Sequence, residues 1–245
     1  MITSIQNIHV KRWKKLQKKK ERWNRLQFLV EGFHLIEEAS KSNWSIHEII
    51  VQKDVTYPNW YKKYPIYTCT ANVINHLSDT ETPQGIMAVI NMKKEIQVFG
   101  NYYLLLDALQ DPGNVGTIIR TADAAGFSAV IIGKGTVDIF NPKTIRASQG
   151  SLFHIPVIQK DLCTQIKQLK NQGVTILSAA LTNAIPYTEI LQKEKVAIVI
   201  GNEGAGIQKE ILEISDQIVK IPIYGKAESL NASIAAGILM YYIRS

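Results

Sequence analysis

The sequence predicts an α/β protein in which a mostly parallel sheet, with helices on both faces, follows a smaller α/β domain. Apolar runs of strand length alternate along the chain with segments of helical periodicity, a pattern typical of βαβ units. From Tyr103 onward the apolar runs lengthen, as expected for parallel strands buried on both faces. We therefore predict two domains, residues 1–93 and 99–245, joined by a polar linker that includes Lys93, Lys94 and Glu95.

The individual elements follow from periodicity. In the first domain we expect strands at 28–30, 46–51, 66–68 and 85–90, a helix at 32–40 and a helical turn at 73–77. In the second domain we expect strands at 103–106, 129–132, 175–179, 196–200 and 217–221. Its helices are expected at 116–125, 144–147, 163–171, 208–214 and 230–244.

Length and composition describe an ordinary globular protein of 245 residues, 46% hydrophobic and 20% charged. Cys69 and Cys163 lie far apart without ligand-spaced partners, so we expect neither a disulfide framework nor a zinc or other metal site. The charged N-terminus argues against a secretory signal. The apolar run at 234–243 is too short to span a bilayer. We expect a cytoplasmic protein that does not act at a membrane.

Positive charge is concentrated at the N-terminus. The net charge is +7, and residues 1–27 alone carry +8. A block of this kind attracts a polyanion. Trp13, Leu16, Trp23 and Leu26 recur at helical spacing, which predicts one apolar helix face opposite the basic residues. Composition alone leaves two interpretations open, a nucleic-acid-binding surface and a solvated lysine-rich helix.

Three stretches of the second domain follow apolar runs, as turns at the carboxyl ends of buried strands would. Open α/β sheets bind ligands at those ends. The chain has no G-x-G-x-x-G after a strand and no G-x-x-x-x-G-K-[ST], which argues against a dinucleotide or a P-loop nucleotide. Glycines can instead let backbone atoms approach a ligand, although a tight strand-to-helix turn needs them equally. The stretches are 114–126, 200–204 and 221–233.

These stretches, in this order and spacing, resemble the SpoU (TrmH-type) branch of the SPOUT RNA methyltransferases. Lys11, Lys15, Lys19, Arg22 and the run 28–32 are similar to family members that carry an N-terminal substrate-binding domain of the ribosomal-protein L30e type. The resemblance implies methyl transfer from S-adenosylmethionine to a ribose 2'-hydroxyl of RNA. It also implies a deep trefoil knot in the second domain, a homodimer, and an L30e-like first domain.

The resemblance assigns the site residue by residue. It implies catalytic roles for Asn114, Arg120, Glu203, Ser229 and Asn231, and cofactor contacts for Ala180, Gly201, Gly204, Ile221 and Leu230. Arginine is a poor base at its unperturbed pKa above ~12, so Arg120 either loses its proton inside the site or holds the adjacent phosphate. Asn114 is expected to orient Arg120 and the loop around the cofactor. Glu203 is expected to hold a neighbouring side chain or Arg120, or alternatively only to cap the helix that follows. For Ser229 and Asn231, a role as helix caps without any part in catalysis is the alternative.

RNA is the expected partner, with Lys11, Lys15, Lys18, Lys19 and Arg22 as its contacts. Ribosomal RNA is the preferred substrate, and transfer RNA is an alternative. A non-catalytic RNA-binding or ribosome-assembly protein with the same fold is a second hypothesis, which the intact catalytic set argues against. A methyltransferase acting on a small molecule or a protein would leave the basic block unexplained. The sequence separates neither a housekeeping enzyme from a resistance enzyme nor one target nucleotide from another.

Overall fold

The computed structural model describes residues 1–93, 97–191 and 193–245, and the chain divides into two compact units. The N-terminal unit comprises Met1–Glu95 and Phe140–Phe153, and the C-terminal unit comprises Ile96–Ile139 and His154–Ser245. Of the predicted linker, Lys94 and Glu95 lie outside the described residues. The sequence did not predict that residues 140–153 group with the first unit. Separate roles for domains 1–93 and 99–245 stay a prediction.

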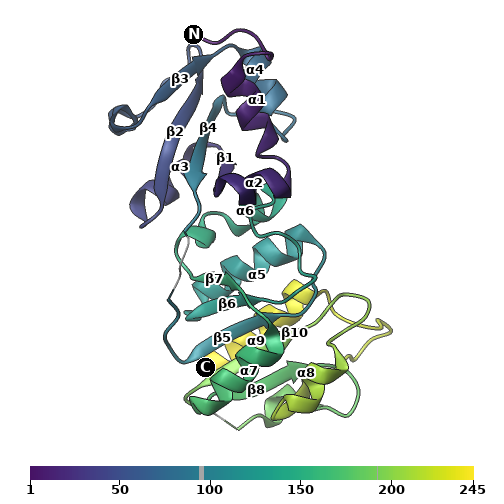
Figure 1. Ribbon diagram of the computed structural model, residues 1–245. Coiled ribbons are helices and arrows are strands. Elements are labelled where there is room, and N and C mark those ends of the chain that lie inside the picture. Colours follow the sequence, from purple (N-terminus) through teal and green to yellow (C-terminus); the bar gives the residue numbers. More distant parts are fainter. Residues whose placement is uncertain (94–96, 192) are drawn as a thin grey trace. The chain divides into compact units, whose positions relative to one another are not determined.

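The N-terminal unit is built on a four-stranded sheet in the order β1-β4-β2-β3 (Figure 1). Only β2 and β3 are parallel. Each predicted strand and helix between residues 28 and 90 is present within a few residues of its expected ends. The elements are α1 (Ile8–Lys15), α2 (Lys19–Arg25), β1 (Gln27–Glu31), α3 (Phe33–Lys41), β2 (Ser45–Gln52), β3 (Ile66–Cys69), α4 (Ala71–Leu77), β4 (Ile86–Asn91) and α6 (Pro142–Ser148).

Two apolar layers hold this sheet. One is formed mainly by α1 and α4, whose buried side chains pack with Ile50, Met87 and Val89. The other contains an aromatic cluster in which the Phe28 ring lies 4.5 Å from Phe140 and 6.4 Å from Phe153, measured between ring centroids. Phe140 and Phe153 are 5% and 4% exposed. Burial of these two rings explains why residues 140–153 belong to the N-terminal unit.

The basic N-terminal segment is two helices, so the prediction of one continuous apolar face is wrong. Helix α1 ends at Lys15, and α2 begins at Lys19. The buried guanidinium of Arg22 donates hydrogen bonds to the carbonyls of Leu16 and Gln17, at 3.0 and 2.7 Å, just beyond the end of α1. These carbonyls have no N–H partner within a helix, and the Arg22 guanidinium donates to them instead. Beyond the break the apolar face is lost, because Trp23 is 40% exposed.

The C-terminal unit contains a seven-stranded sheet in the order β7-β6-β5-β10-β8-β11-β9, and every neighbouring pair is parallel. Strands β7 and β9 were not predicted, because three and two residues are too few to show a periodicity. The strands are β5 (Tyr102–Leu106), β6 (Ala129–Ile132), β7 (Val157–Gln159), β8 (Thr175–Ala179), β9 (Ile185–Pro186), β10 (Val196–Ile200) and β11 (Gln217–Lys220). The helices are α5 (Pro112–Ala124), α7 (Leu162–Asn171), α8 (Lys209–Ile214) and α9 (Ala232–Arg244).

Helices cover both faces of this sheet, which confirms the predicted fold class (Figure 1). Helices α7 and α8 pack on one face, against Tyr103, Leu105 and Ile176 among others. Helices α5 and α9 pack against each other on the opposite face. Strand β10 lies between β5 and β8, both of which precede it in the chain. Strand order does not show whether the chain threads through a loop, so the trefoil knot stays a prediction.

No helix among the described residues has the length and apolarity needed to cross a membrane.

Candidate active site

The predicted site lies along one edge of the parallel sheet. Strands β10, β8 and β11 are neighbours, so their carboxyl ends meet at the same edge. Ala180, Gly201 and Ile221 directly follow these three strands. The sheet therefore gathers the loops that begin with three of the predicted cofactor residues, although 41 positions separate the first from the last.

The loop between β5 and α5 lies at the same edge, because β5 is the neighbour of β10 in the sheet. Ala108 has a positive φ of 56°, a conformation that costs a non-glycine residue about 1–3 kcal/mol and that recurs at functional sites. Asp111 caps α5 by accepting a hydrogen bond from the amide of Asn114 at 2.7 Å, and Pro112 occupies the first turn. The predicted start at Gly116 is therefore wrong, and Asn114 lies in the first turn of the helix.

Three side chains form a continuous hydrogen-bonded chain, which we call the Glu–Asn–Asn chain. Asn114 Nδ2 donates to Glu203 Oε1 at 3.1 Å, and Asn231 Nδ2 donates to Asn114 Oδ1 at 3.0 Å. Asn231 Oδ1 in turn accepts from the amide and hydroxyl of Ser233 at the start of α9. Because an ionised carboxylate only accepts, it sets the orientation of both amides. The chain joins three segments, those after β5 and β10 and that before α9.

Glu203 accepts additional hydrogen bonds from the main chain. The amides of Gln110 and Asp111 donate to its carboxylate at 3.3 and 3.4 Å. Partial burial by itself would raise the pKa of Glu203, but hydrogen bonds from Asn114 and from backbone amides outweigh it and lower the pKa below the ordinary value. Glu203 is therefore held as a carboxylate that braces the β5–α5 loop.

Arg120 and Ser229 stand apart from this chain. Both are exposed, and neither side chain forms a hydrogen bond or ion pair with the part of the protein that the structure describes. Among the described contacts, neither Asn114 nor Glu203 binds Arg120. Glu203 holds the neighbouring Asn114 side chain, one of the roles expected for it, and it also accepts a hydrogen bond from the β5–α5 loop. Asn114 is bonded on its other side to Asn231. Arg120 projects from α5 with its charge available to a ligand.

In the loop after β10, Gly201 and Gly204 have different surroundings. A Cβ added at Gly201 would clash with the carbonyl carbon of Gly206 and lie 2.5 Å from the amide nitrogen of Ile207. The loop's own backbone therefore requires glycine at 201, which is the turn interpretation rather than ligand approach. A Cβ at Gly204 would meet only Asn202 Oδ1, at 3.7 Å. Space beside Gly204 is thus open.

Asn202 and Asp107 were missed by sequence reasoning, and both shape this loop. Asn202 Nδ2 donates to the carbonyl of Ala108 at 2.8 Å, and its Oδ1 accepts from the amides of Gly204 and Ala205. Asp107 is 1% exposed and accepts from the amide and side chain of Gln208. Their signal in the sequence was an Asp directly after an apolar strand and an Asn one residue further on, where a turn or helix cap is favoured.

The remaining cofactor positions lie near the predicted boundaries. Strand β11 ends at Lys220, so Ile221 is the first residue of the following loop. Helix α9 begins at Ala232 with Asn231 as its N-cap, so Leu230 precedes the helix that it was predicted to open. Leu230 is 36% exposed, and Leu181, next to Ala180, is 52% exposed. These two apolar side chains accompany the strand-end loops and suit contact with a flat aromatic ligand.

The N-terminal basic residues divide into two groups. Three of them serve the fold: Arg12 pairs with the buried Glu48 at 2.6 Å, Lys14 donates to the carbonyl of His76, and Arg22 is buried. The prediction that Arg22 lies on a solvent-facing basic surface is therefore wrong. The other six are exposed, and we call them the basic surface: Lys11, Lys15, Lys18, Lys19, Lys20 and Arg25.

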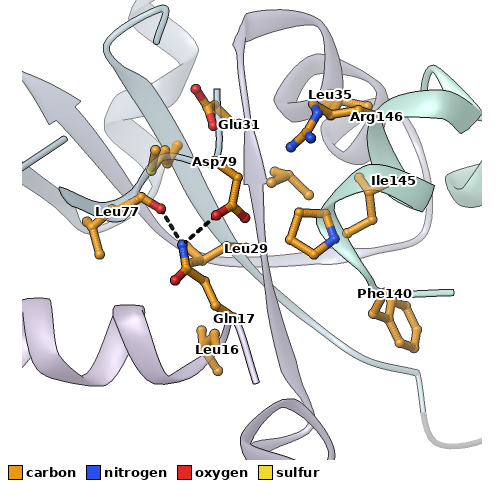
Figure 2. Close-up of a pocket in the computed structure, with 13 residues that line it drawn as sticks. Leu16, Gln17, Leu29, Glu31, Leu35, Leu77, Asp79, Phe140, Ile145 and Arg146 are labelled. Carbon is orange, nitrogen blue, oxygen red and sulfur yellow. Dashed lines mark hydrogen bonds between the residues drawn. The ribbon is translucent and has the colours of Figure 1, made fainter. Parts of the chain in front are cut away.

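A cavity is present within the N-terminal unit, and none of the predicted catalytic or cofactor residues lines it (Figure 2). Gln17 Nε2 donates there to the carbonyl of Leu77 at 2.8 Å and to Asp79 Oδ1 at 3.1 Å. Apolar side chains such as Leu29 and Ile145 form much of its wall, and Glu31 and Arg146 add charge. Among the described residues, no group of three or more His, Cys, Asp or Glu gathers as metal ligands.

Both parts of the chain match known protein families. Residues 101–241 match the SpoU rRNA Methylase family, and residues 7–88 match the MRM3-like substrate binding domain. The chain is 47% identical over 244 residues to the 23S rRNA (guanosine(2553)-2'-O)-methyltransferase RlmP of Bacillus subtilis (strain 168), covering 99% of this chain and 98% of the relative.

Solved structures resemble the whole chain as well. The S-adenosylmethionine-bound rRNA methyltransferase from Sinorhizobium meliloti has a TM-score of 0.90 and 31% identity, covering 99% of this chain and 96% of that one. The SpoU methyltransferase AviRb from Streptomyces viridochromogenes, also bound to S-adenosylmethionine, has a TM-score of 0.88 and 25% identity, covering 98% and 97%. On these matches, the chain belongs to the SpoU rRNA methylase family.

Proposed function

We propose that this protein transfers a methyl group from S-adenosylmethionine to the ribose 2'-hydroxyl of a guanosine in 23S rRNA. The observation that carries the proposal is the 47% identity to RlmP, which extends over both units of the chain. The protein is an S-adenosylmethionine-dependent RNA 2'-O-methyltransferase, and its two-part sequence match provides a catalytic part and a part for substrate binding. The target is the nucleotide equivalent to that of RlmP.

The strand-end edge fits S-adenosylmethionine. The open side of Gly204 and the half-buried Ile221 offer backbone and apolar contacts, and the exposed Leu230 suits the adenine ring. Ala180 and Gly201 begin two of the same loops. When bound, the cofactor supplies a methyl group activated by a positively charged sulfur. Gly201 contributes by closing its own turn, which keeps the neighbouring amides in place.

The chain's own residues then orient the ribose. Arg120 holds the phosphate beside the target nucleotide, because its guanidinium is exposed and engages no described side chain. Glu203 and Asn231 position Asn114, whose side chain faces the same loops. Ser229, exposed just before Asn231, is placed to contact substrate or cofactor. Orientation of this kind can contribute ~7–11 kcal/mol to a transfer reaction.

RNA is held by the basic surface of the N-terminal unit, including Lys11, Lys15, Lys18 and Lys19. Exposed lysines gain affinity for phosphates by releasing condensed counterions. Arg22 is left out of this surface, since its guanidinium is buried against two carbonyls.

The protein acts as a homodimer, as we expect from its family, and α9 provides part of the interface. Ile234 and Tyr241 on this helix are each 55% exposed, more than an ordinary core helix leaves to solvent. A monomer in light scattering at micromolar concentration would contradict this assignment.

The test is methyl transfer from radiolabelled S-adenosylmethionine to 23S rRNA and to tRNA, both isolated from cells that lack the modification. We expect an alkali-resistant dinucleotide that begins with 2'-O-methylguanosine, obtained from 23S rRNA alone. A labelled tRNA product would support the alternative substrate, tRNA. A relative that is 31% identical to the chain is named as a putative TrmH family tRNA/rRNA methyltransferase. Cofactor binding without label in either RNA would support the non-catalytic hypothesis.

A further inference from the structure

Trp23 is an exposed aromatic side chain in the most positively charged part of the protein. It is 40% exposed, whereas Trp13 is fully buried and Trp44 is 9% exposed. It lies on α2 four residues after Lys19 and three after Lys20, so all three side chains occupy neighbouring positions on the helix surface. The exposed part of the indole forgoes hydrophobic stabilisation and leaves aromatic surface available to a ligand.

The indole packs against an aromatic ring. Its ring centroid lies 5.9 Å from that of Phe140, with the planes inclined at 65°. Phe140 itself is 5% exposed and packs against Phe28 and Trp44 in the aromatic cluster. The helix that carries Trp23 is anchored by its neighbour Arg22, through hydrogen bonds to Leu16 and Gln17. Trp23 is therefore held by a rigid base while part of its ring stays open.

An aromatic face beside lysines is the combination that binds unpaired nucleotides. Bases stack on the ring, and ammonium groups reach the flanking phosphates. Paired bases are stacked inside a helix and cannot use such a face, so the combination favours single-stranded RNA, loops or bulges. Lys18, Lys19 and Lys20 are all exposed; Lys18 is the N-cap of α2, and Lys19 and Lys20 lie in its first turn.

We propose that Trp23 is a base-stacking residue for an unpaired nucleotide of the RNA substrate, with Lys19 and Lys20 at the adjoining phosphates. This rests on the proposed function insofar as RNA is the substrate. Stacking and charge make separable contributions. Loss of the ring lowers affinity at every salt concentration, whereas loss of a lysine also lowers the salt dependence.

The experiment compares full-length Trp23→Leu and Trp23→Tyr with wild type in binding a single-stranded oligonucleotide RNA and a duplex of equal length, over a series of salt concentrations. Trp23→Leu keeps an apolar contact with Phe140 and removes the aromatic face, and we expect it to weaken single-strand binding about 5- to 150-fold. Trp23→Tyr keeps a stacking face and should retain most of the affinity. Both should show the wild-type salt slope, whereas Lys19→Ala should reduce the slope by ~1.

Indole fluorescence provides a measurement that does not depend on the Leu variant folding. Single-stranded RNA should quench wild-type emission, and Trp23→Phe should lose that component. The proposal would be overturned if Trp23→Leu bound single-stranded RNA with unchanged affinity, or if it lost as much affinity for the duplex. It would also be overturned if the substitution weakened binding of a protein partner and not of RNA. If the wild type methylates 23S rRNA and Trp23→Leu binds RNA with wild-type affinity, the base-stacking role of Trp23 is refuted and the proposed function stands. If wild type neither binds nor methylates RNA, the proposed function fails first.

Discussion

Gly201 and Gly204 lie three residues apart in one loop, and the structure predicts opposite outcomes when each is changed to alanine. At Gly201 the new Cβ would lie 2.5 Å from the amide nitrogen of Ile207 and 2.6 Å from the carbonyl oxygen of Gly206. That backbone cannot move freely, because Asn202 and Gly206 exchange two hydrogen bonds of 2.9 and 3.0 Å. Overpacking of this kind costs about 1–3 kcal/mol. For a protein of this size each kcal/mol lowers Tm by roughly 2–4 °C.

At Gly204 the new Cβ meets only Asn202 Oδ1, at 3.7 Å, which is ordinary van der Waals contact. The φ angle of Gly204 is not in the positive region that disfavours alanine. We therefore expect the free energy of unfolding to change by less than ~0.5 kcal/mol. Affinity for S-adenosylmethionine should nevertheless fall by at least about tenfold, equivalent to ~1.4 kcal/mol, because the methyl group occupies the space through which the ligand approaches the backbone.

Calorimetric unfolding and isothermal titration with S-adenosylmethionine measure the two effects separately, with each variant serving as the control for the other. Gly201→Ala should lower Tm by between ~2 and 12 °C. An unchanged Tm for Gly201→Ala would refute the argument from loop packing. Wild-type cofactor affinity in Gly204→Ala would remove Gly204 from the set of cofactor contacts.

The other predictions concern charge. Arg120→Ala should lower kcat about 10²–10³-fold with cofactor affinity nearly unchanged in calorimetry, and loss of cofactor binding would contradict the phosphate role. Glu48→Gln should lower the free energy of unfolding in urea by about 1–3 kcal/mol, because the buried Glu48 accepts hydrogen bonds from Arg12 and Trp13, while the partly exposed Arg12 can regain water. The lowered pKa of Glu203 means that its stabilising contribution is complete above the unfolded value of 4.5 and is lost as pH falls through the lower folded value. The Tm difference between wild type and Glu203→Gln should therefore be constant from pH 6 to 8 and disappear in acid, and a difference that grows in acid would contradict this sign.

Periodicity located most of the elements because burial repeats along each strand and helix. The runs at 129–132, 175–179 and 196–200 coincide with β6, β8 and β10. Errors arose where a local feature overrode the pattern. Helix α5 begins four residues earlier than predicted because Asp111 caps it, and the basic segment breaks after α1, where Arg22 binds the carbonyls left unpaired. Helical spacing predicts neither event, because each depends on a hydrogen bond from a single side chain.

The sequence by itself determined the fold class, the family and the set of polar residues at the carboxyl ends of the strands, because these depend on residue type and order. The tertiary structure decided what those residues touch. Asn114 and Asn231 are 117 positions apart, and only the neighbouring placement of α5 and α9 brings their amides to 3.0 Å. The same applies to Trp23, which sequence periodicity assigned to one apolar face with Trp13 and which the structure leaves 40% exposed. Contacts between distant segments depend on how elements pack, and a pattern along the chain does not contain that information.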